Sequence, residues 1–291
     1  MSNASIALVS GLLTYDSGKT WFVIGLAKSI VEKGYSVAVF KPIAGHNLWS
    51  QYKTFQYSVK ARMLLGEDVG KYISYLKLND QPQIMNPIDI LLAPPDPARY
   101  ISNRDLISYL EDLENQFKQM VLARYSDCEH GTSKHYVFRS NIAKLPPHIQ
   151  RIVEKLSFSV EAEDASAEDF IARLRSASVE ENIDKCLSKL MQGKNLVIVE
   201  SFNDAITPYI RLLDKVANIF VVMPTAVAIY SDIVKVKNVV IENVKRFGEL
   251  GLKAYNLLQH LPPDNVMGLM PRTSEIEYDT VFEELIKILF S

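Results

Sequence analysis

The sequence has few cysteines, no long apolar run and almost no net charge. Cys128 and Cys186 are the only two cysteines in 291 residues, and they form no CxxC pair. We therefore expect no disulfide framework and a reducing compartment, the cytoplasm. No stretch approaches the roughly 20 apolar residues of a membrane span. The first residues also lack the basic start and the longer apolar stretch of a secretory signal.

Charge of neither sign dominates. Lysine and arginine total 32 and aspartate and glutamate total 34, so the net charge is −2. This balance gives no global reason to expect nucleic acid or an anionic membrane as a partner. With 48% hydrophobic and 23% charged residues, the composition is that of an ordinary globular protein. The length predicts one large domain, or one domain with a sizeable insertion.

The first 41 residues have the pattern of a strand, a glycine loop, a helix and a second strand. Residues 5–10 are apolar and end at Gly11, as in a buried strand. Apolar residues then recur at helical spacing over 19–33, and Gly34 ends that helix. A second apolar strand over 35–40 follows. Such a unit predicts parallel strands joined by a right-handed crossover.

The rest of the chain favours an α/β fold. Five prolines in 82–98 predict an ordered loop. Helices are expected over most of 48–80, over 103–124 and 148–156, within 161–192 with Ser166 as N-cap, over most of 226–260, where Val234–Val244 is valine-rich enough to hide a strand, and over 278–290. A hairpin is expected around 135–139, and strands over 195–200, 219–223 and 265–270. The expected architecture is a mainly parallel sheet flanked by helices in a single domain, 1–291, with a mostly helical insertion at 100–192.

The segment from Gly11 to Thr20 predicts a phosphate-binding loop. Gly18 allows close approach of the backbone, Lys19 supplies a cation, and Thr20 supplies a hydroxyl for Mg²⁺ at the start of a helix. The usual spacing would place glycine at position 13, which is Leu13. The alternative is an ordinary strand–helix turn with an exposed lysine. The residues expected to bind the nucleotide are Gly11, Thr14, Tyr15, Asp16, Ser17, Gly18, Lys19, Thr20 and Trp21.

Gly18-Lys19-Thr20 followed by residues 34–45 resembles the dethiobiotin synthetase and cobyrinic acid amidase-like family of P-loop NTPases. In that family a Lys-Pro pair ends the second strand, and its lysine points at the transferred phosphoryl group, as Lys41-Pro42 would. The resemblance extends to the proline-rich segment 85–95, to strand 197–202 with Glu200 as the magnesium-proximal acid, and to segments 221–223 and 267–271.

Three departures point away from a true dethiobiotin synthetase. Residues 58–60 offer no carboxylate where the family has a magnesium-binding aspartate. The glycine-rich turn after the glutamate is replaced by residues 201–204. Gly45 or His46 stands where the family tends to place a serine. The resemblance therefore predicts a P-loop ATPase or GTPase of another branch.

The resemblance assigns catalytic roles to Lys19, Lys41 and Glu200, and metal-binding roles to Thr20 and Glu200. The implied cofactors are ATP or GTP and Mg²⁺, with ATP favoured because no Asn-Lys-x-Asp stretch is present. Asp16 is a candidate for contact with the base, the ribose or a partner subunit. Asp204 is a candidate for the missing magnesium acid.

Three functions remain open at this stage. The first is an ATP-dependent ligase that activates a small carboxylate acceptor. The second is a nucleotide-dependent switch or regulatory ATPase with a protein partner, and the third is a binder without turnover. The family implies a homodimer. Weaker site candidates are a metal cluster of Cys128, His130 and His135, a phosphate or substrate contact by His46, and an anion-binding or merely solvated set of basic residues, Lys134, Arg139, Lys144 and Arg151.

Overall fold

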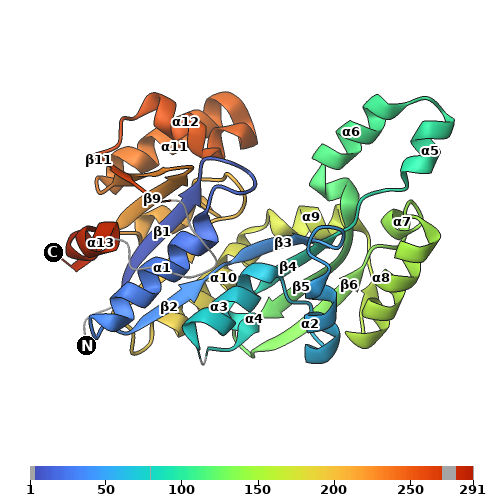
Figure 1. Cartoon of the computed structure of the whole chain (residues 1–291), viewed down its shortest axis with the longest axis horizontal. Helices are drawn as coiled ribbons and strands as arrows, with labels where there is room; N and C mark the ends of the chain where they lie inside the picture. The colour runs from blue at the N-terminus through green and yellow to red at the C-terminus, as the bar shows by residue number, and fades with distance from the viewer. Residues whose placement is uncertain (1–3, 79, 271–279, 291) are drawn as a thin grey trace. The chain divides into compact units, whose positions relative to one another are not determined.

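The computed structural model describes residues 4–78, 80–270 and 280–290 and divides the chain into two compact units. The first unit comprises residues 1–43, 72–80 and 187–291, and the second comprises 44–71 and 81–186 (Figure 1). Helices α3 (Glu67–Leu76) and α10 (Ala177–Met191) each contribute residues to both units. The second unit takes in more of the chain than the insertion expected at 100–192.

The first unit is built on a six-stranded sheet in the order β11-β10-β9-β1-β8-β2. Strand β1 pairs in parallel with both β8 and β9, and β2 pairs in parallel with β8. Strands β10 and β11 extend one edge in antiparallel orientation. The bounds are β1 (Ser5–Gly11), β2 (Val37–Phe40), β8 (Leu196–Glu200), β9 (Asn218–Met223), β10 (Ala226–Tyr230) and β11 (Asn265–Gly268).

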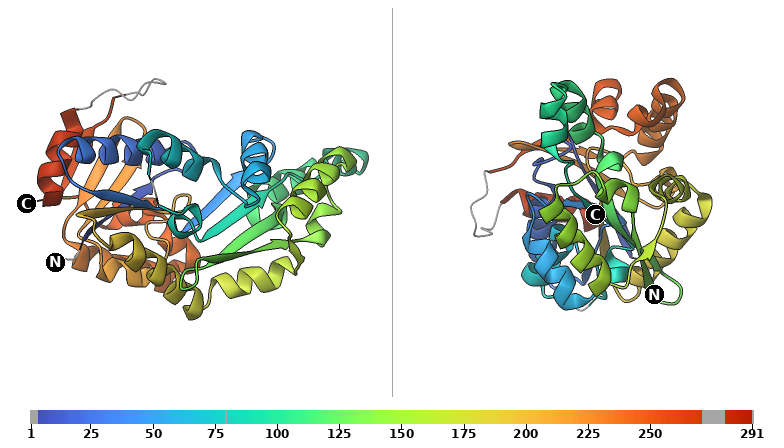
Figure 2. Two further views of the ribbon diagram at one scale, coloured as in Figure 1. Left: turned by 90° about the horizontal axis from the view of Figure 1, so that it is seen from below. Right: turned by 90° about the vertical axis from the view of Figure 1, so that its right-hand side faces the viewer.

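Helices cover both faces of this sheet, which explains the near-continuous apolar runs of its central strands. Helix α1 (Lys19–Glu32) packs beside α13 (Thr280–Phe290), where the Phe22 ring lies 5.9 Å from Phe220 and 5.6 Å from Phe282. Helices α11 (Ile233–Phe247) and α12 (Ala254–His260) lie on the opposite side of the sheet (Figure 2). Short 3₁₀ turns η2 (Ile210–Asp214) and η3 (Gly248–Leu252) complete the unit.

The second unit has its own five-stranded sheet in the order β3-β4-β5-β6-β7. Its strands are β3 (Ile43–Asn47), β4 (Ile88–Leu92), β5 (Met120–Asp127), β6 (Thr132–Val137) and β7 (Glu163–Asp164). Strand β5 pairs antiparallel with β4 and β6, and β6 pairs in parallel with β7. The helices are α2 (Lys53–Ala61), α4 (Pro82–Met85), α5 (Pro97–Ser102), α6 (Leu106–Glu114), η1 (Gln116–Gln119), α7 (Arg139–Ile142), α8 (Pro147–Ser159) and α9 (Ala167–Leu174).

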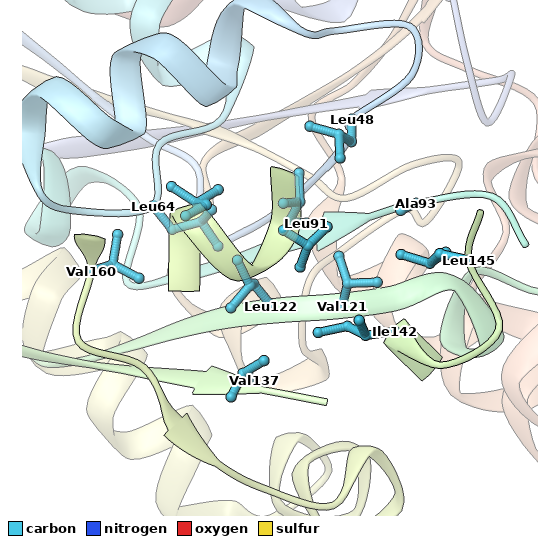
Figure 3. Packing of buried hydrophobic residues seen from close by; sticks show 12 residues of the cluster. Leu48, Leu64, Leu91, Ala93, Val121, Leu122, Val137, Ile142, Leu145 and Val160 are labelled. Atoms are coloured by element: carbon cyan, nitrogen blue, oxygen red, sulfur yellow. The ribbon is translucent and has the colours of Figure 1, made fainter. Parts of the chain in front are cut away.

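An apolar core holds the second unit together. Leu91 of β4 and Val121 and Leu122 of β5 lie within an apolar cluster together with Leu64 (Figure 3). Val153 of α8 belongs to the same cluster. Each of these side chains is at most 1% exposed. Burial of this kind contributes about 25 cal/mol per Å² of apolar surface removed from water, so this unit has a hydrophobic core of its own.

The α/β class is confirmed, but the expected mainly parallel sheet describes the first unit only. In the second sheet the β4–β5 and β5–β6 pairs are antiparallel, and only β5 and β6 are joined by a short connection. The prolines of 82–98 begin helices α4 and α5 and leave room for strand β4 between them. The expected helix over 103–124 gives way to β5 at Met120, and the valine-rich segment 234–244 is helical, inside α11.

The cysteine expectation was wrong, because Cys128 and Cys186 form a disulfide with an S–S distance of 2.04 Å. The bond joins the end of the β5 strand region to α10 within the second unit. A separation of 58 residues hid the pairing from sequence reasoning. Only the tertiary fold brings the two cysteine side chains together.

Pro271, Arg272 and the first two residues of the expected helix 278–290 lie outside the described residues.

Candidate functional site

Two residues of the loop between β1 and α1 have left-handed backbone conformations. Gly18 is the N-cap of α1 with φ of 88°, and Asp16 also adopts a left-handed conformation with φ of 55°. Alternation of left-handed and right-handed residues turns backbone N–H groups toward one side and forms an anion-binding concavity. The positive end of the α1 dipole lies at the same place.

Gly11, which ends β1, has no room for a side chain. A Cβ atom there would lie 2.3 Å from Ser17 Oγ and 2.8 Å from Lys19 Nζ. Lys19 Nζ in turn donates a hydrogen bond to Ser17 Oγ at 3.2 Å, and both residues are buried. The loop therefore folds back over the end of its own strand, with the Lys19 cation held inside it.

The carboxylate of Glu200 connects the loop to two other elements. Thr20 Oγ1 donates to Glu200 Oε1 at 3.2 Å, and Lys41 Nζ forms a salt bridge with the same oxygen at 2.5 Å. Tyr72, on α3, donates its hydroxyl to the other oxygen, Oε2. Glu200 is fully buried and Lys41 is 6% exposed. A buried charge is costly unless it is paired and hydrogen-bonded. The three donors satisfy the Glu200 carboxylate and fix its orientation.

Strand order explains why these residues meet. Lys41 directly follows β2, Glu200 ends β8, and the loop directly follows β1, and these are adjacent parallel strands. Their carboxyl ends therefore share one edge of the sheet, which is where open α/β sheets bind ligands. The sequence predictions for Lys19, Thr20, Lys41 and Glu200 converge at this edge.

The remaining loop residues differ in exposure. Tyr15 is 64% exposed, Asp16 is exposed and Thr14 is partly buried. Trp21 makes an edge-to-face contact with Tyr75 at a centroid distance of 5.1 Å. Trp21 therefore packs within the first unit, beside the threonine at the start of α1.

Among the weaker site predictions, the metal cluster of Cys128, His130 and His135 was wrong, whereas the roles of Asp204 and of the basic residues stay predictions. Asp204 forms a salt bridge with Lys253 at 3.0 Å and is not joined by a hydrogen bond to Glu200. Cys128 is in the disulfide, and His130 pairs with Asp127 at 2.8 Å. Over the described ranges, no three side chains of histidine, cysteine, aspartate or glutamate gather in a way that could hold a metal. Of the basic residues in the insertion, Lys134 and Arg139 pair with Glu163 and Asp164.

The second unit contains a separate buried row of ionisable side chains. Asp89 on β4, Arg124 on β5 and His135 on β6 occupy directly paired register positions. His46 Nδ1 lies 3.2 Å from Asp89 Oδ1, and Arg124 Nε donates to the carbonyl of Leu64 at 2.9 Å. His46 is thus paired with Asp89.

Burial controls the protonation of this row. It lowers the pKa of the Arg124 guanidinium to about 10, although the neighbouring Asp89 carboxylate opposes the shift. Burial and the Arg124 cation together lower the pKa of His135 to about 4. A neutral His135 can then accept a hydrogen bond at Nε2, which it does from Leu64 N at 3.1 Å. The row holds the segment that precedes α3 in place.

Sequence reasoning missed Tyr72 and two buried serines. Tyr72 lies 128 positions before Glu200, and no local pattern connects them. Ser10 and Ser201 are fully buried, and their hydroxyls have no hydrogen-bond partner among the residues that the structure describes. Along the chain Ser10 precedes Gly11 and Ser201 follows Glu200. The only sequence signal for them is that Ser10 lies in one predicted apolar strand and Ser201 directly follows another.

Comparison of the chain with protein-family models, with curated proteins and with solved structures gave no match. In the part of the chain that the structure describes, no helix is long and apolar enough to cross a membrane. The functional proposal therefore depends on the chemistry of the site itself.

Proposed function

We propose that the chain binds a nucleoside triphosphate, ATP or GTP, on the loop 11–20 and transfers or hydrolyses its γ-phosphoryl group with Mg²⁺. One observation carries the proposal: Thr20 and Lys41 both bond to Glu200, at the point where the left-handed Gly18 starts α1. A phosphate cradle, a hydroxyl, a cation and a carboxylate are the groups that phosphoryl transfer needs in one place.

The donor set fits Mg²⁺. Thr20 and Glu200 offer a hydroxyl and a carboxylate, both hard oxygen donors, with the two oxygens 3.2 Å apart. Mg²⁺ usually takes one or two protein oxygens and completes its shell with phosphate and water. When bound, the ion would neutralise charge on the phosphate oxygens. Thr20 would hold it directly, and Glu200 would hold one of its waters.

Two lysines have distinct roles in this proposal. When the nucleotide binds, Lys19 would leave Ser17 and contact the β- and γ-phosphate oxygens, whose negative charge would compensate the positive charge of the lysine. Lys41, buried against Glu200, faces the charge that develops on the transferred group. By resemblance to dethiobiotin synthetase-like ligases, the acceptor would be a small carboxylate. Gly11 keeps the loop closed over the strand end.

The proposal is tested by measuring binding and hydrolysis of ATP and GTP, with Mg²⁺ and with EDTA, for the wild type and for Glu200→Gln. The amide keeps the size of the side chain and removes its charge. We expect Glu200→Gln to bind nucleotide but to lose hydrolysis by about 100-fold or more, as for electrostatic groups at other phosphoryl-transfer sites.

The outcomes separate the three functions. Hydrolysis without any added acceptor indicates a switch or ATPase, and hydrolysis only with an added small carboxylate indicates a ligase. Binding with no turnover in either condition contradicts phosphoryl transfer and leaves a nucleotide binder. Absence of binding contradicts the whole proposal.

A further inference from the structure

In the C-terminal half of α3, Tyr72 contacts Glu200 and Tyr75 contacts helix α1. Tyr72 and Tyr75 are three positions apart, so they lie on the same face of the helix. Tyr72 is 1% exposed and its hydroxyl bonds to Glu200 Oε2. Tyr75 is 38% exposed, and its ring contacts Trp21 and lies 5.8 Å from Lys28 Nζ.

The three donors divide the oxygens of Glu200 unequally. Oε1 receives both Thr20 and Lys41, whereas the recorded bond to Oε2 comes from Tyr72. The terminal torsion of a glutamate is broad and roughly two-fold, so bonds to one oxygen alone do not fix the carboxylate plane. The Tyr72 hydroxyl supplies the second point that fixes it.

This orientation matters for metal binding. Donation of the Thr20 hydrogen to Oε1 of Glu200 leaves the lone pairs of the hydroxyl oxygen available to Mg²⁺. Rotation of the carboxylate would remove that acceptor. A phenol is suited to hold it because it donates a hydrogen bond and brings no charge into a buried site that already contains a salt bridge.

We infer that Tyr72 is a positioning residue for the proposed magnesium site, acting through Glu200 and touching neither the metal nor the nucleotide. The inference rests on the proposed function. It deepens that function by making the Mg²⁺ dependence of nucleotide binding, and not nucleotide binding itself, depend on Tyr72. Partners of this kind, one step from the metal, commonly change metal affinity or activity by about 10- to 100-fold.

The test compares Tyr72→Phe with Tyr75→Phe. Each substitution deletes one hydroxyl from the same helix face and keeps the ring, but only the first removes a bond to Glu200. ATP and GTP binding is measured by equilibrium dialysis in EDTA and at rising Mg²⁺, so no turnover is needed. For Tyr72→Phe we expect affinity in EDTA within about twofold of wild type, and a Mg²⁺ requirement raised about tenfold or more. Tyr75→Phe is expected to match the wild type throughout.

Three results would overturn the inference. The first is a Tyr72→Phe protein with the Mg²⁺ requirement of the wild type. The second is an equal change in Tyr75→Phe, which would assign the effect to the packing of α3. The third is failure of the wild type to bind nucleotide both in EDTA and with Mg²⁺. That last result also removes the proposed function, whereas the first two leave it intact.

Discussion

At the scale of single residues, Gly11 and Lys19 depend on each other. The space that a Cβ atom of residue 11 would take is filled by Ser17 Oγ and by the Lys19 side chain. The glycine is therefore required by close approach inside the loop and not by an unusual φ angle. A side chain there must displace the side chains of Ser17 and Lys19.

Gly11→Ala is expected to weaken nucleotide binding while the protein remains folded. The methyl group would displace Lys19 Nζ, which now lies 2.8 Å from the position of that Cβ. Nucleotide dissociation constants and circular dichroism measure the two effects separately. Gly268→Ala is the control, because a Cβ atom at Gly268, in the same sheet, has no neighbour within 4 Å. Wild-type affinity in Gly11→Ala would show that the loop is not the binding site.

A second prediction at this scale concerns His135. Its pKa in the folded protein is about 4 against 6.5 for the free side chain, so the unfolded chain binds the proton more readily. The contribution to stability is complete above pH 6.5 and is lost as the pH falls toward 4. This difference in pKa corresponds to at most about 3 kcal/mol in the free energy of unfolding.

His135→Gln is expected to flatten that pH dependence. Glutamine keeps an acceptor for Leu64 N and cannot take up a proton in this range. Urea unfolding at several pH values between 7 and 4 gives the slope for each protein. Identical slopes for wild type and variant would mean that His135 is not held neutral by the fold.

At the scale of elements, the sequence predicts those parts whose periodicity is local. The β1–loop–α1–β2 unit, strands β8 and β9, helix α8 and the Ser166 cap all occur as expected. In the cap, Ser166 Oγ accepts from Asp169 N at 3.2 Å. Capping geometry and buried apolar runs are determined within a few residues, which is why the pattern suffices.

The elements that the sequence did not predict depend on distant partners. Strand β5 reads as the end of a charged helix, and its Arg124 looks like a surface residue. It is a strand because β4 and β6 pair with it. Its Arg124 guanidinium is buried because the Leu64 carbonyl, Ser126 and Asn86 accept its hydrogen bonds. The contact of Tyr72 with Glu200 has the same origin. Lys41 and Glu200 were predictable because each ends a recognisable strand.

The disulfide gives the prediction for this scale. It ties α10 to the β5–β6 hairpin across 58 residues, and closing a loop of that length stabilises a fold by about 4 kcal/mol in the chain-entropy model. Reduced wild type and Cys128→Ala/Cys186→Ala should therefore both unfold at lower urea than the oxidised wild type. Thiol titration of unreduced, denatured protein checks the bond directly. Two free thiols would contradict the disulfide.

At the scale of the whole molecule, the charge balance and the two units limit the kinds of partner. A net charge of −2 provides no long-range attraction for polyanions, so the anion is expected to be captured locally by the loop. The first unit contains every residue assigned to the proposed nucleotide site, from Gly11 through Tyr72 to Glu200. The second unit has a separate core and the buried row of ionisable residues Asp89, Arg124 and His135, with His46 paired to Asp89. Binding of the triphosphate is therefore a property to be sought in the first unit.

The most direct test is equilibrium binding of ATP and GTP to the purified wild type beside Lys19→Ala and Lys33→Ala. Lys33 follows the same helix at its far end and pairs with Glu283 at the surface, so its loss controls for the removal of a lysine. We expect the wild type and Lys33→Ala to bind one of the two nucleotides alike, and Lys19→Ala to lose it by about 100-fold or more, as expected for a buried charge-assisted contact. Equal binding by all three proteins, or by none, would contradict a phosphate-binding loop at residues 11–20.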